Sequence, residues 1–138
     1  MSSTIIPTMR YRDAPKMIRW LHEAFGFEKH FVVDDGTGGI AHAQLTLGGG
    51  MIMLGTARDD EFGRLQATPA ALGRTTQSPY IVVADADAVC ARVKAAGAEV
   101  VRAMQDEDYG GRAFSCRDPE GRLWNFGTCD PWPAESQS

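Results

Sequence analysis

The sequence predicts an α+β fold built from two βαβββ modules, whose curved mixed sheets enclose a cleft. Two observations lead to this fold class. Two segments carry apolar residues at the i, i+3, i+4, i+7 spacing of an amphipathic helix, and the second segment repeats the spacing of the first. Each segment also lies between one short strand-like run and three later ones. A duplicated unit of one strand, one helix and three strands therefore accounts for nearly the whole chain.

The first unit begins with a predicted strand at residues 4–11, which leads into a helix. Asp13 is placed to cap this helix, Pro15 lies in its first turn, where a missing N–H costs little, and Gly26 ends it. Runs of alternating character then predict three strands. The apolar face of the helix comprises Ala14, Met17, Ile18, Leu21, Ala24 and Phe25. The three strands are predicted at residues 28–34, 40–47 and 51–54.

The second unit follows the same order. A strand is predicted at residues 79–84, and Asp85 is the candidate N-cap of a helix that ends at Gly97. Duplicated units of this kind can also form a ferredoxin-like sandwich, but three hairpin-linked strands after each helix argue against that alternative. The apolar face of the helix comprises Ala86, Val89, Cys90, Val93 and Ala96. The later strands are predicted at residues 99–103, 112–117 and 122–128.

We expect both units to form a single domain over residues 1–138. The polar connection between them contains glycines and a proline and shows no sustained period, which predicts a linker that can act as a lid, with one short helix near residues 69–72. A final stretch of prolines and small polar residues predicts a frayed tail. Module one spans 4–55, the linker 56–78, module two 79–129 and the tail 130–138.

Composition argues against several classes of partner. The 138 residues carry a formal net charge of −4, so no broad positive field is available for nucleic acid or anionic lipid. The chain lacks the roughly 18 consecutive apolar residues of a membrane span and the features of a secretory signal. Cys90, Cys116 and Cys129 are odd in number and form no CxxC pair, which favours reduced thiols. We expect a cytoplasmic protein without nucleic-acid or membrane partners.

Three stretches occur in a recognisable order: MRYRDAPKMIRWLHEAFGFE at 9–28, AQLTLGGGMIMLG at 43–55 and DYGGRAFSCRDPEGRLWNFG at 108–127. The most specific features are an aspartate before the first helix, FGFE at its exit, and DPEG leading into the last strand. The chain thereby resembles the vicinal oxygen chelate superfamily, which includes glyoxalase I, bleomycin-resistance proteins and extradiol dioxygenases. The resemblance implies paired βαβββ modules around a cavity and a homodimer, with a divalent metal in many members.

The resemblance also implies four metal-ligand positions, where metal-dependent members carry His, Glu or Gln. A divalent ion in a cleft needs three or four strong donors, most of them anionic or imidazole. A proline side chain has no donor atom, and amide oxygens are weak donors. We therefore expect no metal and no other cofactor, and we interpret the amide in the last strand as a residue with no cation to neutralise. The four positions fall on Pro7, Gln44, Tyr80 and Asn125.

Side-chain alternation selects further residues that can line the cleft. His42 and Gln44 share the mixed face of the strand at 40–47, whereas its other face is apolar. His42 is the weak candidate for catalysis, because imidazole suits acid–base chemistry near neutral pH, and a structural role is its alternative. Arg112 is a candidate for binding an anionic group, or for an ion pair with Asp118 or Glu120. The predicted ligand-binding residues are Met9, Tyr11, His42, Gln44, Tyr80, Arg112 and Asn125.

Three hypotheses about function follow. The first is a metal-independent, homodimeric small-molecule-binding protein of the glyoxalase and bleomycin-resistance type, which binds or sequesters an apolar or aromatic ligand. The second is a metal-dependent lyase, isomerase or dioxygenase of the same superfamily, with His42, Gln44 and a carboxylate such as Glu120 or Asp108 as ligands. The third is a cofactor-free enzyme that uses His42 or Tyr80 to transfer a proton. The sequence leaves open whether the protein is an enzyme.

Overall fold

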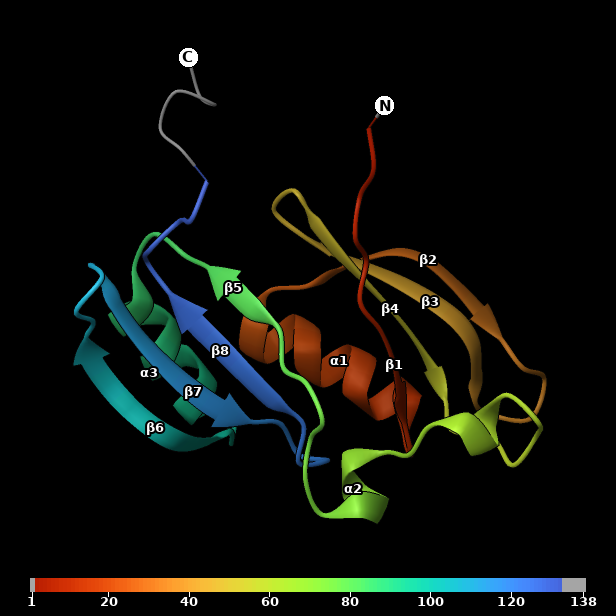
Figure 1. Cartoon of the computed structure of the whole chain (residues 1–138). Coiled ribbons are helices and arrows are strands. Elements are labelled where there is room, and N and C mark those ends of the chain that lie inside the picture. Colours follow the sequence, from red (N-terminus) through yellow and green to blue (C-terminus); the bar gives the residue numbers. More distant parts are fainter. Residues whose placement is uncertain (1, 133–138) are drawn as a thin grey trace.

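The computed structural model describes residues 2–132, which form two four-stranded mixed sheets with helices in an α+β arrangement (Figure 1). The strand order is β1-β4-β3-β2 in the first sheet and β5-β8-β7-β6 in the second. This repeated order confirms the predicted fold class and excludes the ferredoxin-like alternative. The elements are β1 (Thr8–Tyr11), α1 (Ala14–Phe25), β2 (Glu28–Asp34), β3 (Ile40–Leu47), β4 (Gly50–Thr56), η1 (Gly63–Leu65), α2 (Pro69–Leu72), β5 (Tyr80–Val82), α3 (Ala86–Ala95), β6 (Glu99–Asp106), β7 (Arg112–Arg117) and β8 (Leu123–Gly127).

Both modules open on a strand that starts directly after a proline, so β1 begins later than predicted; β5 begins one residue later than predicted and also ends earlier, at Val82. Strand β1 pairs in parallel with β4, and β5 pairs in parallel with β8. The carbonyl of Pro7 accepts a hydrogen bond from Met53 N at 2.9 Å, and that of Pro79 accepts one from Asn125 N at 3.0 Å. Because proline has no N–H to donate, neither ladder extends further toward the N-terminus.

Helix α1 follows its local sequence signals. The Asp13 side chain accepts a hydrogen bond from Lys16 N at 3.2 Å, and Gly26 adopts a left-handed conformation with φ of 89° at the C-terminal end. In α3, Asp85 caps the first turn as predicted, but the helix ends at Ala95 and Gly97 lies just beyond it. The short helix expected in the linker is α2.

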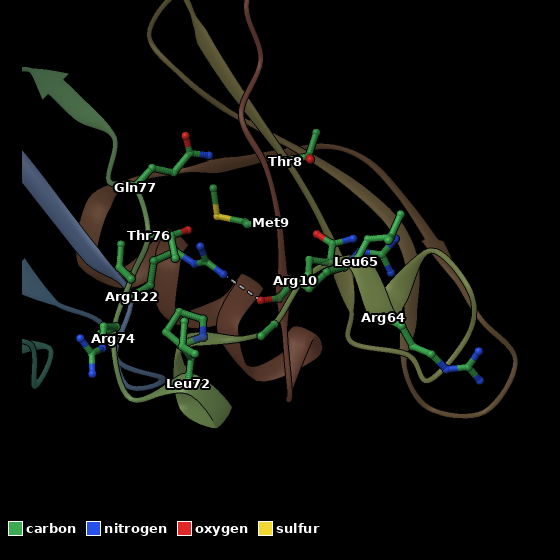
Figure 2. A pocket seen from close by; sticks show the side chains of 14 residues that line it. Thr8, Met9, Arg10, Arg64, Leu65, Leu72, Arg74, Thr76, Gln77 and Arg122 are labelled. Atoms are coloured by element: carbon green, nitrogen blue, oxygen red, sulfur yellow. Dashed lines mark hydrogen bonds between the residues drawn. The ribbon is translucent and has the colours of Figure 1, made fainter.

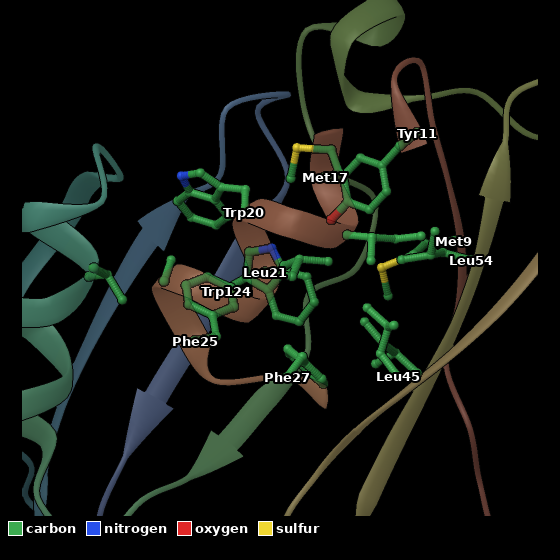
Figure 3. Packing of buried hydrophobic residues seen from close by; sticks show 14 of the residues in the cluster. Met9, Tyr11, Met17, Trp20, Leu21, Phe25, Phe27, Leu45, Leu54 and Trp124 are labelled. Atoms are coloured by element: carbon green, nitrogen blue, oxygen red, sulfur yellow. The ribbon is translucent and has the colours of Figure 1, made fainter. Parts of the chain in front are cut away.

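One hydrophobic core serves both modules. Helix α1 lies between the two sheets in Figure 1, and its C-terminal Phe25 places its ring centroid 5.1 Å from that of Trp124 and 4.9 Å from that of Phe126, both in β8 (Figure 3). Trp20 donates a hydrogen bond from Nε1 to the carbonyl of Ala96 at 2.8 Å, which links α1 to the end of α3. The first module therefore cannot pack independently of the second.

The DPEG turn before β8 fastens the second module to the start of α1. Asp118 is buried, and its Oδ2 accepts hydrogen bonds from the Tyr11 hydroxyl at 2.6 Å and from Trp124 Nε1 at 3.0 Å. The carboxylate of Glu120 accepts bonds from the backbone N–H groups of Arg12 and Asp13, each at 2.7 Å. The motif that carried the family resemblance thus joins the modules.

The helices and cysteines of residues 2–132 can be compared with the predictions made from composition. None of the described helices is long and apolar enough to cross a membrane. The three cysteines are free thiols. Burial, followed by the charge of Asp118, raises the pKa of the Cys116 thiol to about 12, so this cysteine is a poor nucleophile at neutral pH. The predicted tail at 130–138 lies outside the described residues from position 133 onward.

Candidate functional site

Each sheet packs one face on the core and leaves the other free of helices. In β4, Ile52 and Leu54 are buried while Met51 and Met53 are half-buried, and in β8 Trp124 is buried while Asn125 is half-buried. The alternation puts successive side chains on opposite faces of each sheet. The polar and sulfur-containing side chains on the helix-free faces form the candidate site.

The helix-free face of the first sheet holds His42 and Gln44 as predicted. The Nε2 atoms of the two side chains lie 3.1 Å apart, and because an amide nitrogen can only donate, this hydrogen bond forms with the imidazole tautomer whose Nε2 accepts. The ring of Phe31, a residue that is 54% exposed, lies 6.4 Å from the imidazole. A pocket of about 230 Å³ opens beside His42, with Met53 and Phe62 also in its wall.

The helix-free face of the second sheet carries Asn125, whose amide is fully engaged. Its Nδ2 donates to Ser78 Oγ at 2.8 Å and to the carbonyl of Pro79 at 3.0 Å, and its Oδ1 accepts from Ser115 Oγ at 2.6 Å. The amide therefore ties β8 to β7 and to the segment before β5. An aspartate at position 125 would place a carboxylate oxygen against the carbonyl of Pro79 and could not donate to Ser78. The hydrogen bonds of the fold therefore explain why this residue is an amide.

Tyr80 lies in the neighbouring strand and points along the same face. Its ring crosses Gly127, where an added Cβ would lie 2.9 Å from Tyr80 Cε1, and its hydroxyl donates to the carbonyl of Cys129 at 2.7 Å. Partial burial, followed by the neighbouring Tyr109 and Cys129, raises the pKa of Tyr80 above its ordinary value. The phenol stays protonated at neutral pH and acts as a hydrogen-bond donor.

The four positions that the resemblance assigns to metal ligands do not make a divalent-metal donor set. Pro7 has no side-chain donor, Gln44 turns its nitrogen to His42, and the oxygens of Tyr80 and Asn125 are used in hydrogen bonds. Among residues 2–132, no group of three His, Cys, Asp or Glu side chains is arranged to hold a metal ion. These residues do not fit the metal centre of the metal-dependent members.

Two predicted site residues in β1 lie on the opposite face from the one expected. Parallel pairing places Met9 beside Leu54 and Thr8 beside Met53, so Met9 and Tyr11 point into the core at 5% and 0% exposure (Figure 3). The Tyr11 hydroxyl is consumed by Asp118, and burial raises the pKa of this tyrosine well above its usual value. Tyr11 is therefore a structural residue, whereas Met9 still forms part of several pocket walls.

Arg112 makes ion pairs, but with partners other than those predicted. Its guanidinium binds both oxygens of Asp87 at 3.0 Å and Asp106 at 2.9 Å. These carboxylates raise the pKa of Arg112 and occupy the donors that an anionic ligand would need. Asp118 and Glu120 instead lie in the turn that joins the modules. Arg112 is thereby removed from the candidate site.

A larger pocket that the sequence did not indicate lies at the module junction. It has a volume of about 520 Å³ and is bounded by residues 8–10 of β1, by linker residues between 64 and 77, and by Arg122 (Figure 2). We call it the junction pocket. It shares Thr8 and Met9 with the pocket beside His42 and with a third pocket of about 340 Å³. The linker, predicted to act as a lid, supplies much of its wall.

Comparison with known proteins places the chain in a family. Its residues 6–126 match the Glyoxalase/Bleomycin resistance protein/Dioxygenase superfamily. An uncharacterized protein of Mycobacterium tuberculosis is 32% identical over 121 residues, which cover 88% of this chain and 71% of that protein. A similar protein of Mycobacterium bovis is also 32% identical, over 88% of this chain and 80% of its own length.

Solved structures give the same result. TioX from Micromonospora sp. ML1 is 32% identical, with a TM-score of 0.72 over 91% of this chain and 98% of that one. A mutant of the fosfomycin resistance protein FosX from Listeria monocytogenes, complexed with Mn(II) and 1S,2S-dihydroxypropylphosphonic acid, is 18% identical, with a TM-score of 0.69 over 95% and 93% of the two chains. At that identity FosX shares the fold. The chain belongs to the Glyoxalase/Bleomycin resistance protein/Dioxygenase superfamily.

Proposed function

We propose that this protein is a metal-independent small-molecule-binding protein of the glyoxalase and bleomycin-resistance type, which binds or sequesters an apolar or aromatic ligand in the cytoplasm. The observation that carries the proposal is the character of the helix-free sheet faces. Large apolar side chains are exposed there, with Phe31 at 54% on the first sheet and Tyr80 at 42% and Val82 at 44% on the second. The first sheet also borders a pocket lined by His42 and Met53. Exposed apolar surface of this kind is typical of ligand and protein interfaces.

A homodimer is the second part of the proposal. Each chain leaves one face of each sheet uncovered, and a second copy that brings its own sheet opposite would convert two open faces into a closed cleft. Closure would bury the apolar side chains on both faces and exclude water from the ligand. Size-exclusion chromatography with light scattering tests this part, and a monomer at micromolar concentration would contradict it.

The binding test uses chelator-treated protein and the neutral dye Nile red, followed by a panel of aromatic natural products. We expect the dye fluorescence to rise with saturable binding, and we expect Phe31→Ala and Met53→Asp to weaken binding. The matched control is Trp132→Ala, which removes a 75% exposed aromatic side chain that borders none of the three pockets around Met9. Binding that is absent, or that all three variants reduce equally, would count against the proposal.

The metal-dependent lyase, isomerase or dioxygenase remains the alternative, and calorimetric titration separates the two. The weak donor set at Gln44 and Asn125 predicts no tight binding of Mn²⁺, Ni²⁺ or Zn²⁺. One ion bound tightly per subunit, and lost in His42→Ala, would favour the alternative. A cofactor-free proton transfer is supported by one contact, because the amide of Gln44 lies at hydrogen-bond distance from His42 beside a pocket.

A further inference from the structure

We propose that the junction pocket binds the anionic oxygen group of an organic ligand, a carboxylate or a phosphate, through the guanidinium of Arg122, with Arg10 and Arg74 at its rim. This inference rests on the proposed function, because it specifies the charge of a ligand in the same cleft. The ligand is then amphipathic, with an apolar part on the helix-free face beside His42 and an acidic group at the module junction.

The first argument is an excess of positive charge in an acidic protein. The whole chain carries a net charge of −4, yet the wall of the junction pocket contains four arginines and neither Asp nor Glu. Arg64 is neutralised by Asp59 at 3.1 Å, and its guanidinium points away from Arg122 in Figure 2. Among the described residues, no ion pair forms at Arg10, Arg74 or Arg122. An anion bound in this pocket would therefore meet positive charge that no acidic side chain neutralises.

The second argument is the fixed orientation of Arg122. Its guanidinium carbon lies 4.9 Å from the ring centroid of Tyr11, and one terminal nitrogen donates to the carbonyl of Arg10 at 2.9 Å. Its Nε is buried and has no hydrogen-bond partner within the described residues. A guanidinium that is held by an aromatic ring and one carbonyl, and that keeps an unpartnered Nε, is preorganised for an oxyanion.

Within the described part of the chain, the two acids nearest in sequence, Glu120 and Asp118, form no ion pair with Arg122. The carboxylate oxygens of Glu120 accept hydrogen bonds from the backbone N–H groups of Arg12 and Asp13. Both oxygens of Asp118 are used: Oδ2 accepts from Tyr11 and Trp124, and Oδ1 accepts from the backbone N–H groups of Glu120 and Arg122. These four bonds hold the Asp118 carboxylate in the core. The positive charge of the guanidinium is therefore left for a ligand.

The rest of the pocket favours an organic anion over a bare ion. Leu65, Pro69 and Leu72 provide apolar wall, while Thr76 and Gln77 provide further hydrogen-bonding groups. A volume of about 520 Å³ accommodates a small organic molecule. Because the pocket shares Thr8 and Met9 with the pocket beside His42, one ligand can reach both.

The test compares three probes of similar shape, benzoate, phenyl phosphate and neutral benzamide, by calorimetry on the intact protein. We expect at least one anion to bind about tenfold or more tightly than benzamide, with an affinity that falls as salt rises. We expect Arg122→Lys to weaken anion binding about tenfold, because an ammonium cannot replace the planar fork, and Arg74→Ala to weaken it a few-fold. Arg64→Ala removes the same charge from the pocket wall and should leave the affinity unchanged.

A readout on the wild-type chain guards against misfolding of the Arg122 variant. In arginine side-chain NMR spectra, the Nε–H signal of Arg122 should shift on adding the anion, while that of Arg64 should not. Selective binding of benzoate would assign a carboxylate, and selective binding of phenyl phosphate a phosphate. Equal affinities for anions and benzamide, or an unshifted Arg122 signal, would overturn the inference. Nile red binding without anion binding would leave the proposed function standing, and anion binding without Nile red binding would leave only the inference.

Discussion

Replacing Asp118 by asparagine tests how the two modules are joined. The carboxylate is 4% exposed and accepts four hydrogen bonds, two at each oxygen. Asparagine has almost the same shape but only one accepting oxygen. If its NH₂ group faces the backbone, two N–H donors are orphaned. If it faces the core, the Tyr11 hydroxyl can turn and accept, but Trp124 Nε1 loses its partner.

The expected loss of stability follows from this count. An orphaned buried donor costs about 1–3 kcal/mol, and the bonds that remain are no longer charge-assisted. Relief from burying a charge offsets part of the loss. We therefore expect Asp118→Asn to lower the free energy of unfolding by about 2–3 kcal/mol, and the melting temperature by about 10 °C. Urea unfolding followed by tryptophan fluorescence measures the change.

The control is Asp87→Asn, which removes an exposed carboxylate that pairs with Arg112 at the surface. We expect no resolvable change in stability there, because exposed ion pairs contribute little. The reasoning would be refuted if Asp118→Asn were as stable as the wild type, or if both variants lost the same amount. Either result would mean that the modules do not depend on the buried carboxylate.

The stability difference between the wild type and Asp118→Asn should depend on pH. Burial raises the pKa of Asp118 above 3.8, against the lowering effect of its hydrogen bonds. The folded protein then holds this proton more tightly than the unfolded chain does. The stability that the group contributes is complete below the unfolded pKa and is lost as pH rises through the folded pKa. The stability difference between wild type and Asp118→Asn should therefore widen as pH falls from neutral toward about 4, and a constant difference would contradict the shift.

Two further substitutions probe the helix-free face of the second sheet. In Gly127→Ala the added methyl group should displace the phenol ring of Tyr80 from its place over Gly127 and break its hydrogen bond to Cys129, which exposes the phenol. The pKa of Tyr80 should then fall toward its ordinary value in an alkaline absorbance titration, with Tyr80→Phe as the reference. An unchanged titration would show that the position of the ring does not depend on the glycine. Asn125→Asp should cost about 1–3 kcal/mol in chemical unfolding, because a carboxylate cannot donate to Ser78 and would face the carbonyl of Pro79; equal stability would show that these bonds are dispensable.

Much of the fold could be read from the sequence because its signals are local. Asp13 and Asp85 cap helices within three residues of themselves, and Gly26 takes up a positive φ that most residues avoid. The repeated apolar spacing predicted both helices and, with the strand patterns, the duplicated module. The faces of β3 were predicted from residue 42 onward, since His42 and Gln44 share the helix-free side, whereas an irregularity at the start of the strand buries Ile40 and exposes Ala41, the reverse of the expected faces. Alternation within one strand needs no knowledge of its neighbours.

The remaining features depend on contacts between residues far apart in the chain, and only the tertiary structure decided them. The face of Met9 and Tyr11 follows from pairing with β4, because a shift of one residue would exchange every side chain between the core and the open face. Several acidic residues lie near Arg112 in the sequence, and the fold of the second module pairs its guanidinium with Asp87 and Asp106. The junction pocket exists because the linker, β1 and the DPEG turn meet there. Local patterns specify elements and faces, whereas the site arises from the way the modules pack on one core.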